Sequence, residues 1–224
     1  MSGAVIVMAK RPAPGATKTR LTPALSDEQA AALYECFLRD ALDIVRAVPG
    51  VTRTIAYPLG DGSHYFRQLA GDFELVPQIG ATLGQRLAYV LDACLGHGQT
   101  PAVAMSSDSP TLPVEHVLRA LAWLAEGGVD VVLGPCEDGG YYLIGLTVPR
   151  PRLLLGVEMS TPHVLADTLA LAAEDGLKVG LLPAWYDVDA AEDLGRLQAD
   201  LATMAPTVAR HTRVLLGTGQ VLTA

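Results

Sequence analysis

Short apolar runs alternate with longer amphipathic stretches along this chain. Residues 4–9 and 102–105 consist of Ala, Val, Ile and Met bounded by turn residues, a pattern that is typical of strands buried on both faces of a sheet. Residues 26–48 and 114–125 instead repeat apolar side chains at helical spacing, which predicts amphipathic helices. Because such strands and helices take turns along the chain, they predict a mostly parallel sheet covered by helices on both faces.

The remaining elements follow from the same pattern. The first helix is expected to begin at a capping box of Ser26 and Gln29 and to end at Pro49 and Gly50. No repeat or long linker divides the chain, so we expect a single doubly wound α/β domain over residues 1–224, with its ligand site at the carboxyl ends of the strands. Further strands are expected at residues 51–57, 74–76, 129–133, 141–146 and 179–182, and further helices at 65–70, 83–95, 162–174 and 190–204.

The composition narrows the range of partners. The chain carries 24 acidic and 16 basic side chains, a formal net charge of −8, which argues against nucleic acid because that partner requires a basic face. No apolar run approaches the roughly 18 residues of a membrane span, so no membrane partner is expected. Cys36, Cys94 and Cys136 are far apart and the N-terminus lacks a basic leader, which together predict a cytoplasmic protein with reduced thiols.

The loop after the first strand has a charge opposite to that of the whole protein. Four cations follow the strand within a short stretch: Lys10, Arg11, Lys18 and Arg20. Two prolines and Gly15 shape the loop, so its amides and the heads of Lys18 and Arg20 could converge on a phosphate group, which open α/β sheets bind at this position. The glycine spacings of a Walker A loop and of a dinucleotide-binding fingerprint are absent. A solvated basic loop is the alternative interpretation.

Acidic residues follow two of the other expected strands. Asp108 lies just past the strand at 102–105, where its carboxylate could bind a divalent cation or close an Asx turn. Asp187 and Asp189 lie between the last strand and the last helix, and alternation points them the same way. One or both could complete a Mg²⁺ site with Asp108, although Asp189 could also cap the helix.

A third candidate is the segment Glu137, Asp138, Gly139, Gly140. The two glycines permit close approach of the backbone to a ligand, and the two acids could bind an acceptor or act as a general base. A tight turn between two strands is the alternative interpretation of the same residues.

Two weaker patterns concern the nucleobase and the oligomeric state. Gln78 precedes a glycine-opened helix start at residues 80–86 and could contact the edge of a nucleobase, but an ordinary helix entry explains the pattern equally well. The apolar tail at 214–216 and 221–222 could pack on the domain or on a second subunit. A homodimer is therefore possible.

Four ordered motifs carry a resemblance to a known family. They are KRPxPGxxKTRL at 10–21, SDSPxLP at 107–113, GPxEDGGYYLIG at 134–145 and DVDxxEDL at 187–194. Across residues 5–194 the chain resembles the DUF2064 family, also labelled radical-SAM/selenodomain-associated transferase 1, within the GT-A (nucleotide-diphospho-sugar transferase) superfamily. The first loop is also similar to that of the 2-phospho-lactate guanylyltransferases. The resemblance implies a GT-A, Rossmann-like fold.

The resemblance also implies roles for individual residues. Asp108 and Asp189 match the acids that bind Mg²⁺ (or Mn²⁺) in related nucleotidyltransferases. Ser106 stands where many glycosyltransferases have the first acid of Asp-x-Asp, which weakens a typical glycosyltransferase interpretation, and Ala190 and Ala191 stand where Thr-Pro is usual. The residues expected to bind nucleotide are Ala9, Lys10, Gly15, Lys18, Arg20, Gln78, Gly84 and Ser107, and those expected to bind the acceptor are Glu137, Asp138, Gly139 and Gly140.

Three functions are compatible with these features. The first is Mg²⁺-dependent transfer of a nucleotidyl group from a nucleoside triphosphate to a phosphorylated small molecule, with release of pyrophosphate. The alternative is glycosyl transfer from a nucleotide-diphospho-sugar, and the third is a non-catalytic nucleotide-binding module. For an enzyme, the expected catalytic residues are Lys18, Arg20, Asp108 and Asp138.

Overall fold

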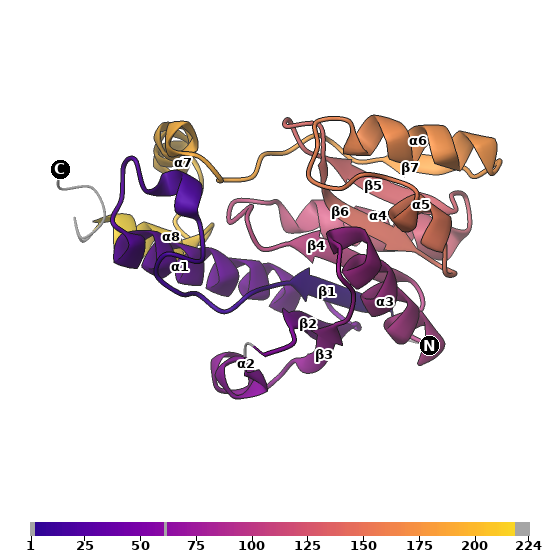
Figure 1. The fold of residues 1–224 in the computed structure, drawn as a ribbon, viewed down its shortest axis with the longest axis horizontal. Coiled ribbons are helices and arrows are strands. Elements are labelled where there is room, and N and C mark those ends of the chain that lie inside the picture. The colour runs from indigo at the N-terminus through magenta and orange to yellow at the C-terminus, as the bar shows by residue number, and fades with distance from the viewer. Residues whose placement is uncertain (1–2, 61, 218–224) are drawn as a thin grey trace.

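The chain folds around one seven-stranded sheet with the strand order β3-β2-β1-β4-β6-β5-β7. The computed structural model describes residues 3–60 and 62–217, and Figure 1 shows the arrangement. Neighbouring strands run parallel except β6, which is antiparallel to both β4 and β5. The predicted mostly parallel α/β sheet is therefore confirmed. The strands are β1 (Ala4–Met8), β2 (Thr52–Pro58), β3 (Glu74–Gln78), β4 (Ala102–Ser106), β5 (Val131–Pro135), β6 (Tyr141–Leu146) and β7 (Val179–Leu181).

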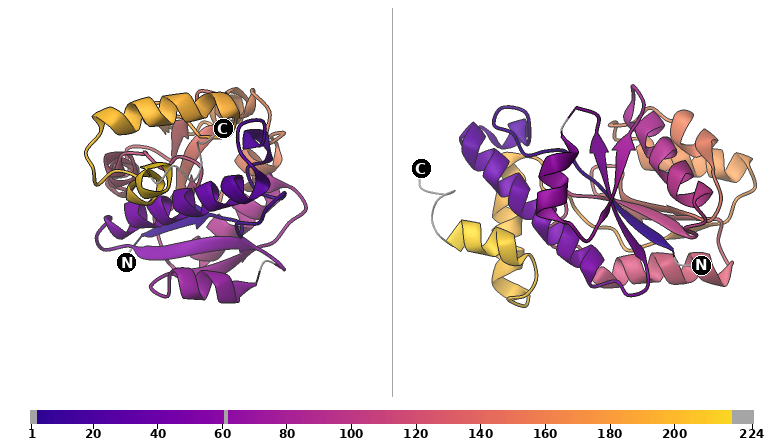
Figure 2. Two further views of the ribbon diagram at one scale, coloured as in Figure 1. Left: turned by 90° about the vertical axis from the view of Figure 1, so that its left-hand side faces the viewer. Right: turned by 90° about the horizontal axis from the view of Figure 1, so that it is seen from below.

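Helices cover both faces of the sheet because each buried strand is apolar on both sides. Val5 and Val7 of β1 face a core shared with α1, α2 and α4, whereas Ala4 and Ile6 face a second core shared with α3, α5 and α6. Figure 2 shows the two layers from two further sides. The helices are α1 (Asp27–Arg46), α2 (Ser63–Leu69), α3 (Leu83–Gly96), α4 (Val114–Glu126), α5 (Pro151–Leu155), α6 (Val164–Glu174), α7 (Ala191–Thr203) and α8 (Arg210–Gly217).

The helix α1 begins as its sequence predicts. The Ser26 hydroxyl accepts the Gln29 N–H at 3.2 Å, and the Gln29 side chain accepts the Ser26 N–H at 2.8 Å. This reciprocal pair is a capping box, and it fixes the direction in which the first loop enters the helix. The loop itself contains a short 3₁₀ helix, η1 (Thr19–Leu21).

Two helices occur where none was expected. The Pro-rich stretch after β6, where no element was predicted, contains α5, and residues 214–216 of the apolar tail belong to α8, which packs against α1. Figure 1 shows α7 and α8 lying beside α1, the first helix of the chain. Leu215 and Leu216 join a third core between α1 and α7, so this part of the tail packs on its own chain. Residues 221–222 lie outside the described residues.

None of the helices in the described ranges combines the length and the apolar character needed to cross a membrane.

Candidate nucleotide and metal site

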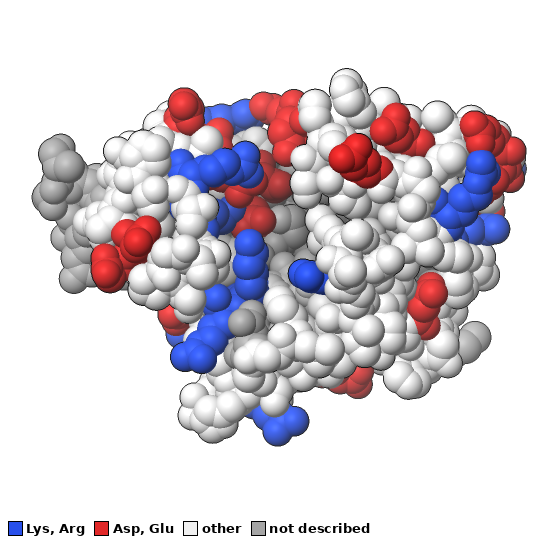
Figure 3. All heavy atoms as spheres, in the orientation of Figure 1, with Lys and Arg blue, Asp and Glu red and all other residues white. Residues whose placement is uncertain are grey.

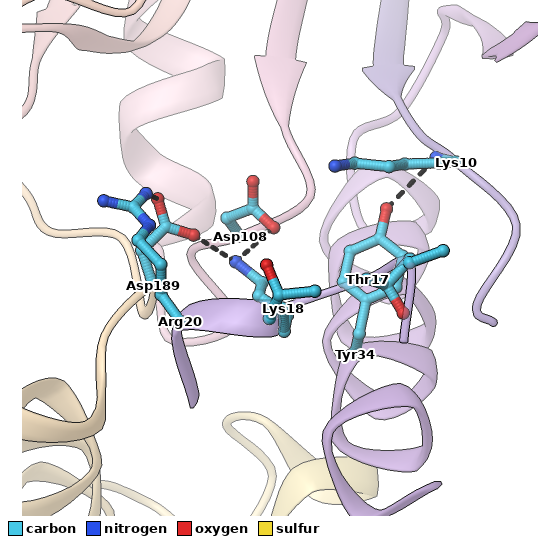
Figure 4. Close-up of a pocket in the computed structure, with 9 residues that line it drawn as sticks. Lys10, Thr17, Lys18, Arg20, Tyr34, Asp108 and Asp189 are labelled. Carbon is cyan, nitrogen blue, oxygen red and sulfur yellow. Dashed lines mark hydrogen bonds and ion pairs between the residues drawn. The ribbon is translucent and has the colours of Figure 1, made fainter. Parts of the chain in front are cut away.

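Three segments far apart in the sequence meet beyond the carboxyl ends of β1 and β4. They are the loop after β1, the turn after β4, and the segment that precedes α7. A hydrogen bond from the Val188 N–H to the Asp108 carbonyl oxygen, 2.9 Å long, joins the last two. Lys18 takes a left-handed backbone conformation, with φ 52° and ψ 38°. Figure 4 shows that its side chain lies between the acids of the other two segments.

The ammonium of Lys18 bridges two carboxylates. Its Nζ lies 2.6 Å from Asp108 Oδ1 and 2.5 Å from Asp189 Oδ1, and only 6% of the Lys18 side chain is exposed. Burial alone would lower the pKa of Lys18, but the two carboxylates raise it above its ordinary value. Burial likewise opposes ionisation of Asp189, and the Lys18 ammonium outweighs it, so the pKa of Asp189 is lowered. Lys18 and Asp189 are therefore both charged at neutral pH.

The local hydrogen bonds decide between the alternative roles of the acids. The N-cap residue of α7 is Ala190 rather than Asp189, and Oδ2 of Asp193 in the first turn accepts the N–H groups of both Asp189 and Ala190 at 2.8 Å. The Asp189 carboxylate is thereby left to face Lys18 and Arg20, whose Nη2 lies 2.8 Å from Asp189 Oδ2.

Asp108 is oriented by a short turn after β4. The Ser106 hydroxyl accepts the Asp108 N–H at 3.0 Å and lies 3.3 Å from Asp108 Oδ2, to which it donates. Ser106 therefore supports the second acid rather than supplying a first one, and Oδ1 of Asp108 is the oxygen that contacts Lys18.

Asp187 has a hydrogen-bond partner of its own. Its carboxyl accepts a hydrogen bond from the Ser109 hydroxyl. Burial and the neighbouring Asp108 carboxylate raise the pKa of Asp187. Asp187 lines the same cleft as Asp108 and Asp189.

A chain of hydroxyl groups fixes the start of the first loop. The Lys10 N–H donates to the Tyr34 hydroxyl at 3.1 Å, and this hydroxyl lies 3.0 Å from Ser107 Oγ. Ser107 donates onward to the Met8 carbonyl oxygen at 3.1 Å. Tyr34 lies within the helix predicted at residues 26–48, and its sequence gives no sign of this role, because only the fold brings β1, β4 and α1 to one point.

The acids and cations border a cleft of about 700 Å³, with a smaller cavity of about 140 Å³ beside the first loop. Figure 3 shows basic side chains around a hollow with acidic side chains at its rim and in its depth. Three cations line the cleft, Lys10, Arg20 and Arg86, together with four acids. Lys18 lines the smaller cavity, as do Asp108 and Asp189.

Most of the expected nucleotide-site residues come together at these two cavities. The predicted residues that line the cleft are Ala9, Lys10, Arg20, Gln78, Asp108, Asp138, Gly140, Asp189 and Ser107. Gln78 uses both hydrogens of its amide, which donate to the carbonyl oxygens of Ala9 and Ala56 at 3.1 and 2.8 Å. Its contact with a base edge would therefore have to use its carbonyl oxygen as an acceptor.

Four of the expected residues lie elsewhere. Glu137 forms a two-point ion pair with Arg196 of α7, with Oε1 2.9 Å from Nη2. A Cβ at Gly84 would come 2.2 Å from the Leu154 carbonyl oxygen, and one at Gly139 would come 2.0 Å from the Pro162 carbonyl oxygen. These two glycines are required for packing against α5 and the loop before α6. Gly15 is exposed in a turn with φ +70°.

Asp138 and Gly140 form the part of the acceptor segment that faces the cleft. The Asp138 side chain accepts the Gly140 N–H at 2.9 Å through Oδ1, which is the tight turn foreseen as the alternative interpretation. Oδ2 of Asp138 takes no part in that bond. Tyr141 and Met159 form an apolar wall beside them.

A second group of possible metal ligands lies between α1 and α8. Asp40, Asp43 and His211 bring one ligand atom each within 4.8 Å of one another. Asp40 accepts hydrogen bonds from the His211 N–H at 2.9 Å and from the Thr212 N–H at 3.0 Å. Arg210 Nε lies 2.7 Å from Asp43 Oδ2. These donors already occupy the carboxylate oxygens, which indicates a structural cluster.

The fold defines this protein as a member of the α/β class found in nucleotide-diphospho-sugar transferase structures. A protein from Desulfovibrio desulfuricans G20, described as a proposed nucleotide-diphospho-sugar transferase, has a TM-score of 0.91 and 30% identity over 98% of this chain and 96% of its own. Residues 41–161, more than half of the chain, match the family described as "Uncharacterized protein conserved in bacteria (DUF2064)". The chain belongs to the DUF2064 family.

More distant structures share the fold. A cytidylyltransferase from Leptospira borgpetersenii serovar Hardjo-bovis has a TM-score of 0.60 at 12% identity, over 99% of this chain and 97% of its own. CMP:2-keto-3-deoxy-manno-octonic acid synthetase in complex with CTP has a TM-score of 0.52 at 12% identity, over 90% and 99%. No curated protein sequence matches the chain.

Proposed function

We propose that this protein is a Mg²⁺-dependent nucleotidyltransferase that joins a nucleoside triphosphate to a phosphorylated small molecule and releases pyrophosphate. The observation that carries the proposal is the pair of carboxylates, Asp108 and Asp189, held around one cation at the edge of a cleft that also contains Lys10 and Arg20. The fold that the chain shares with a cytidylyltransferase supports this class of reaction.

The residues around Lys18 fit a divalent cation. Two carboxylate oxygens already lie 2.5–2.6 Å from a single positive centre, the Lys18 Nζ, which stands in for an ion. Carboxylate oxygens are the ligands that Mg²⁺ prefers, usually one or two of them together with water and phosphate. Bound there, Mg²⁺ would neutralise charge on the α-phosphate and on the leaving pyrophosphate.

The first loop supplies the remaining positive charge. Arg20 is 71% exposed at its side chain and offers a planar fork to phosphate oxygens. Lys10 lines the cleft, and its backbone is held by the Tyr34 hydroxyl, which accepts the Lys10 N–H. An oxygen of the acceptor phosphate would attack the α-phosphorus, and the bond from this phosphorus to the bridging oxygen of the β-phosphate would break. The acceptor is already an anion at neutral pH, so positioning and charge neutralisation suffice without a strong base.

Glycosyl transfer from a nucleotide-diphospho-sugar is the second candidate. It is favoured by the description of the protein from Desulfovibrio desulfuricans G20 and by Asp138, whose carboxylate lines the cleft. A hydroxyl acceptor needs a general base, and Asp138 would take that role. A third possibility, a nucleotide-binding module without turnover, requires the same cleft but no reaction.

Product analysis separates the three functions. The full chain is incubated with Mg²⁺, the four nucleoside triphosphates and a panel of sugar phosphates, and pyrophosphate is measured. Pyrophosphate together with a nucleotidylated product supports the proposal. Release of a nucleoside diphosphate from nucleotide sugars without pyrophosphate would establish glycosyl transfer instead. Thermal stabilisation by nucleotides without turnover of any substrate would indicate a binding module.

The site draws on segments from Met8 to Asp189. This supports our inference that residues 1–224 act as a single domain.

A further inference from the structure

The Lys18 ammonium occupies the position that a metal ion would need. It lies between Asp108 Oδ1 and Asp189 Oδ1 at 2.6 and 2.5 Å, in the space that a cation bound by both carboxylates would fill. An ammonium and a metal ion cannot share this space. The same carboxylate pair therefore has two possible cations, one of them built into the chain.

We propose that Lys18 is an exchangeable cation, which holds Asp108 and Asp189 together in the free protein and transfers its ammonium to nucleotide phosphate oxygens when a metal–nucleotide complex enters. This inference rests on the proposed function, because it assigns that site an order of events. It makes Lys18 a positioning residue for the metal ligands before binding and a phosphate ligand afterwards.

Lys18 is suited to the first role by its surroundings. Without a cation, Asp108 and Asp189 would repel one another, and Asp187 adds a third acid beside them. The stem of Lys18 is buried, and its Nζ lies 5.9 Å from the Tyr34 ring centre and 5.8 Å from the Phe37 ring centre. Both rings therefore help to hold the ammonium where it meets the two acids.

The second role follows from the chemistry of an ammonium and from the adjacent space. A lysine head is a point charge on a flexible stem, without the fixed fork that holds an arginine to one carboxylate geometry. The cavity of about 140 Å³ lies beside Lys18 and is also lined by Lys10, Thr17 and Arg20. Phosphate oxygens entering this cavity would meet the ammonium within reach of its stem.

The exchange links the binding of metal to the binding of nucleotide. A free metal ion must displace the ammonium without offering it a new partner. The apparent affinity for the metal is therefore the intrinsic affinity multiplied by the fraction of molecules in which Lys18 has moved away. A metal–nucleotide complex brings phosphate oxygens that accept the displaced ammonium. Metal and nucleotide must then strengthen each other's binding by the same factor.

Direct measurement of Mn²⁺ binding tests the exchange. The full chain is titrated with Mn²⁺, and free Mn²⁺ is measured by electron paramagnetic resonance, with and without a non-hydrolysable triphosphate analogue. We expect K18M to bind Mn²⁺ alone about tenfold more tightly than the wild type. We expect the analogue to strengthen Mn²⁺ binding by a larger factor in the wild type than in K18M, because only the direct contacts between metal and phosphate remain in K18M.

Two lysines provide matched controls. K10M removes the same charge from the same cavity without removing a contact to either carboxylate, and K178M removes it next to β7. Both should change the affinity for Mn²⁺ alone by less than about threefold, which is the effect of removing one positive charge from the overall electrostatic potential of the protein. An increase in K10M equal to that in K18M would mean a field effect and would overturn the exchange.

Other outcomes would overturn the exchange or separate it from the proposed nucleotidyl transfer. Equal or weaker binding of Mn²⁺ by K18M than by the wild type overturns the inference. If circular dichroism shows that K18M is unfolded, K18R is compared instead, because it keeps a cation between the acids and must bind Mn²⁺ alone as weakly as the wild type. Tighter binding by K18R refutes the exchange. If K18M behaves as expected but the wild type forms no pyrophosphate, the exchange stands and nucleotidyl transfer fails.

Discussion

Two clusters of acids in this protein have similar composition and opposite character. At the candidate site, Asp108 and Asp189 face a single lysine ammonium beside a cavity. Between α1 and α8, Asp40 is 3% exposed and accepts bonds from two backbone N–H groups and from the Thr212 hydroxyl, the last at 2.6 Å. Its neighbour Asp43 pairs with arginines.

The difference lies in what would have to leave for a ligand to enter. Backbone N–H groups of α8 cannot move away from Asp40 without undocking the helix, so these bonds belong to the fold. A lysine head can leave by rotation of its own stem, and it leaves behind two carboxylates with a fixed direction. Clusters of acids are therefore better judged by the mobility of their present partners than by the number of carboxylates.

The largest effect is expected at Asp189. In D189N the second carboxylate of the proposed metal site is lost, so pyrophosphate formation, measured as kcat/KM, should fall at least about a hundredfold. E192Q, in the exposed first turn of α7, is the control and should stay within about twofold of the wild type. If D189N keeps more than a third of the activity, the carboxylate pair is not the metal site.

Asp40 should affect stability instead. D40A leaves the His211 and Thr212 N–H groups and the Thr212 hydroxyl without their acceptor, and Thr212 is fully buried. The free energy of unfolding should fall by about 2–3 kcal/mol, as measured by urea denaturation. E35A serves as the control because Glu35 pairs on the surface of the same helix with Arg39, which predicts a loss below about 0.5 kcal/mol. Similar losses in both variants would contradict the role of Asp40 as the acceptor for the first turn of α8.

The first loop offers a comparison between two arginines. Arg20 lines the cleft, whereas the Arg11 guanidinium lies 5.8 Å from the Tyr65 ring centre. R20A should raise the dissociation constant for a nucleoside triphosphate about tenfold, and R11A less than about threefold, because the proposed function gives a two-point phosphate contact to Arg20 and none to Arg11. Calorimetric titration measures both. Equal effects would indicate a diffuse basic patch rather than a phosphate site.

The smallest effect is expected at Asp72, which pairs with Arg46 at the end of α1. Hydrogen bonds from Arg46 lower the pKa of Asp72 to about 2 from an ordinary value of 3.8. A lowered pKa in the folded state means that Asp72 stabilises the fold fully above about pH 4 and loses this contribution as the pH falls toward 2. D72N should therefore cost less than about 1 kcal/mol at pH 7, since the pair is largely exposed. The difference between D72N and the wild type should vanish near pH 2, and a difference independent of pH would refute the assignment.

Local patterns predicted most of the secondary structure because strands and helices carry their own signals. The capping box at Ser26, the apolar stripe of α1 and the buried runs of β1 and β4 were all visible in the sequence. The helix α8 was not, because its first turn depends on Asp40, a residue in another helix. The helix α5 is only five residues long and begins within a Pro-rich stretch, where no periodicity can develop.

The candidate site was predicted in part for a related reason. Asp108 follows β4, and the first loop follows β1. Because the carboxyl ends of parallel strands lie at the same edge of a sheet, the meeting of Asp108 with the first loop could be predicted. Glu137 stands next to Asp138 in the same turn, yet its carboxylate faces Arg196 of α7. The sequence does not record which of two neighbouring acids faces a cleft, since this depends on a helix 59 positions away.

The sequence by itself determined the layered α/β fold, the cationic first loop and the acids at the strand ends, because each of these depends on residues close together in the chain. Only the tertiary structure decided that Lys18 bridges Asp108 and Asp189. Lys18 and Asp189 are 171 positions apart along the chain. Contacts over such separations exist only after the sheet has formed. The basic loop after β1 thus became a specific ion-paired site through packing of β4 and α7 against it, and not through its own composition.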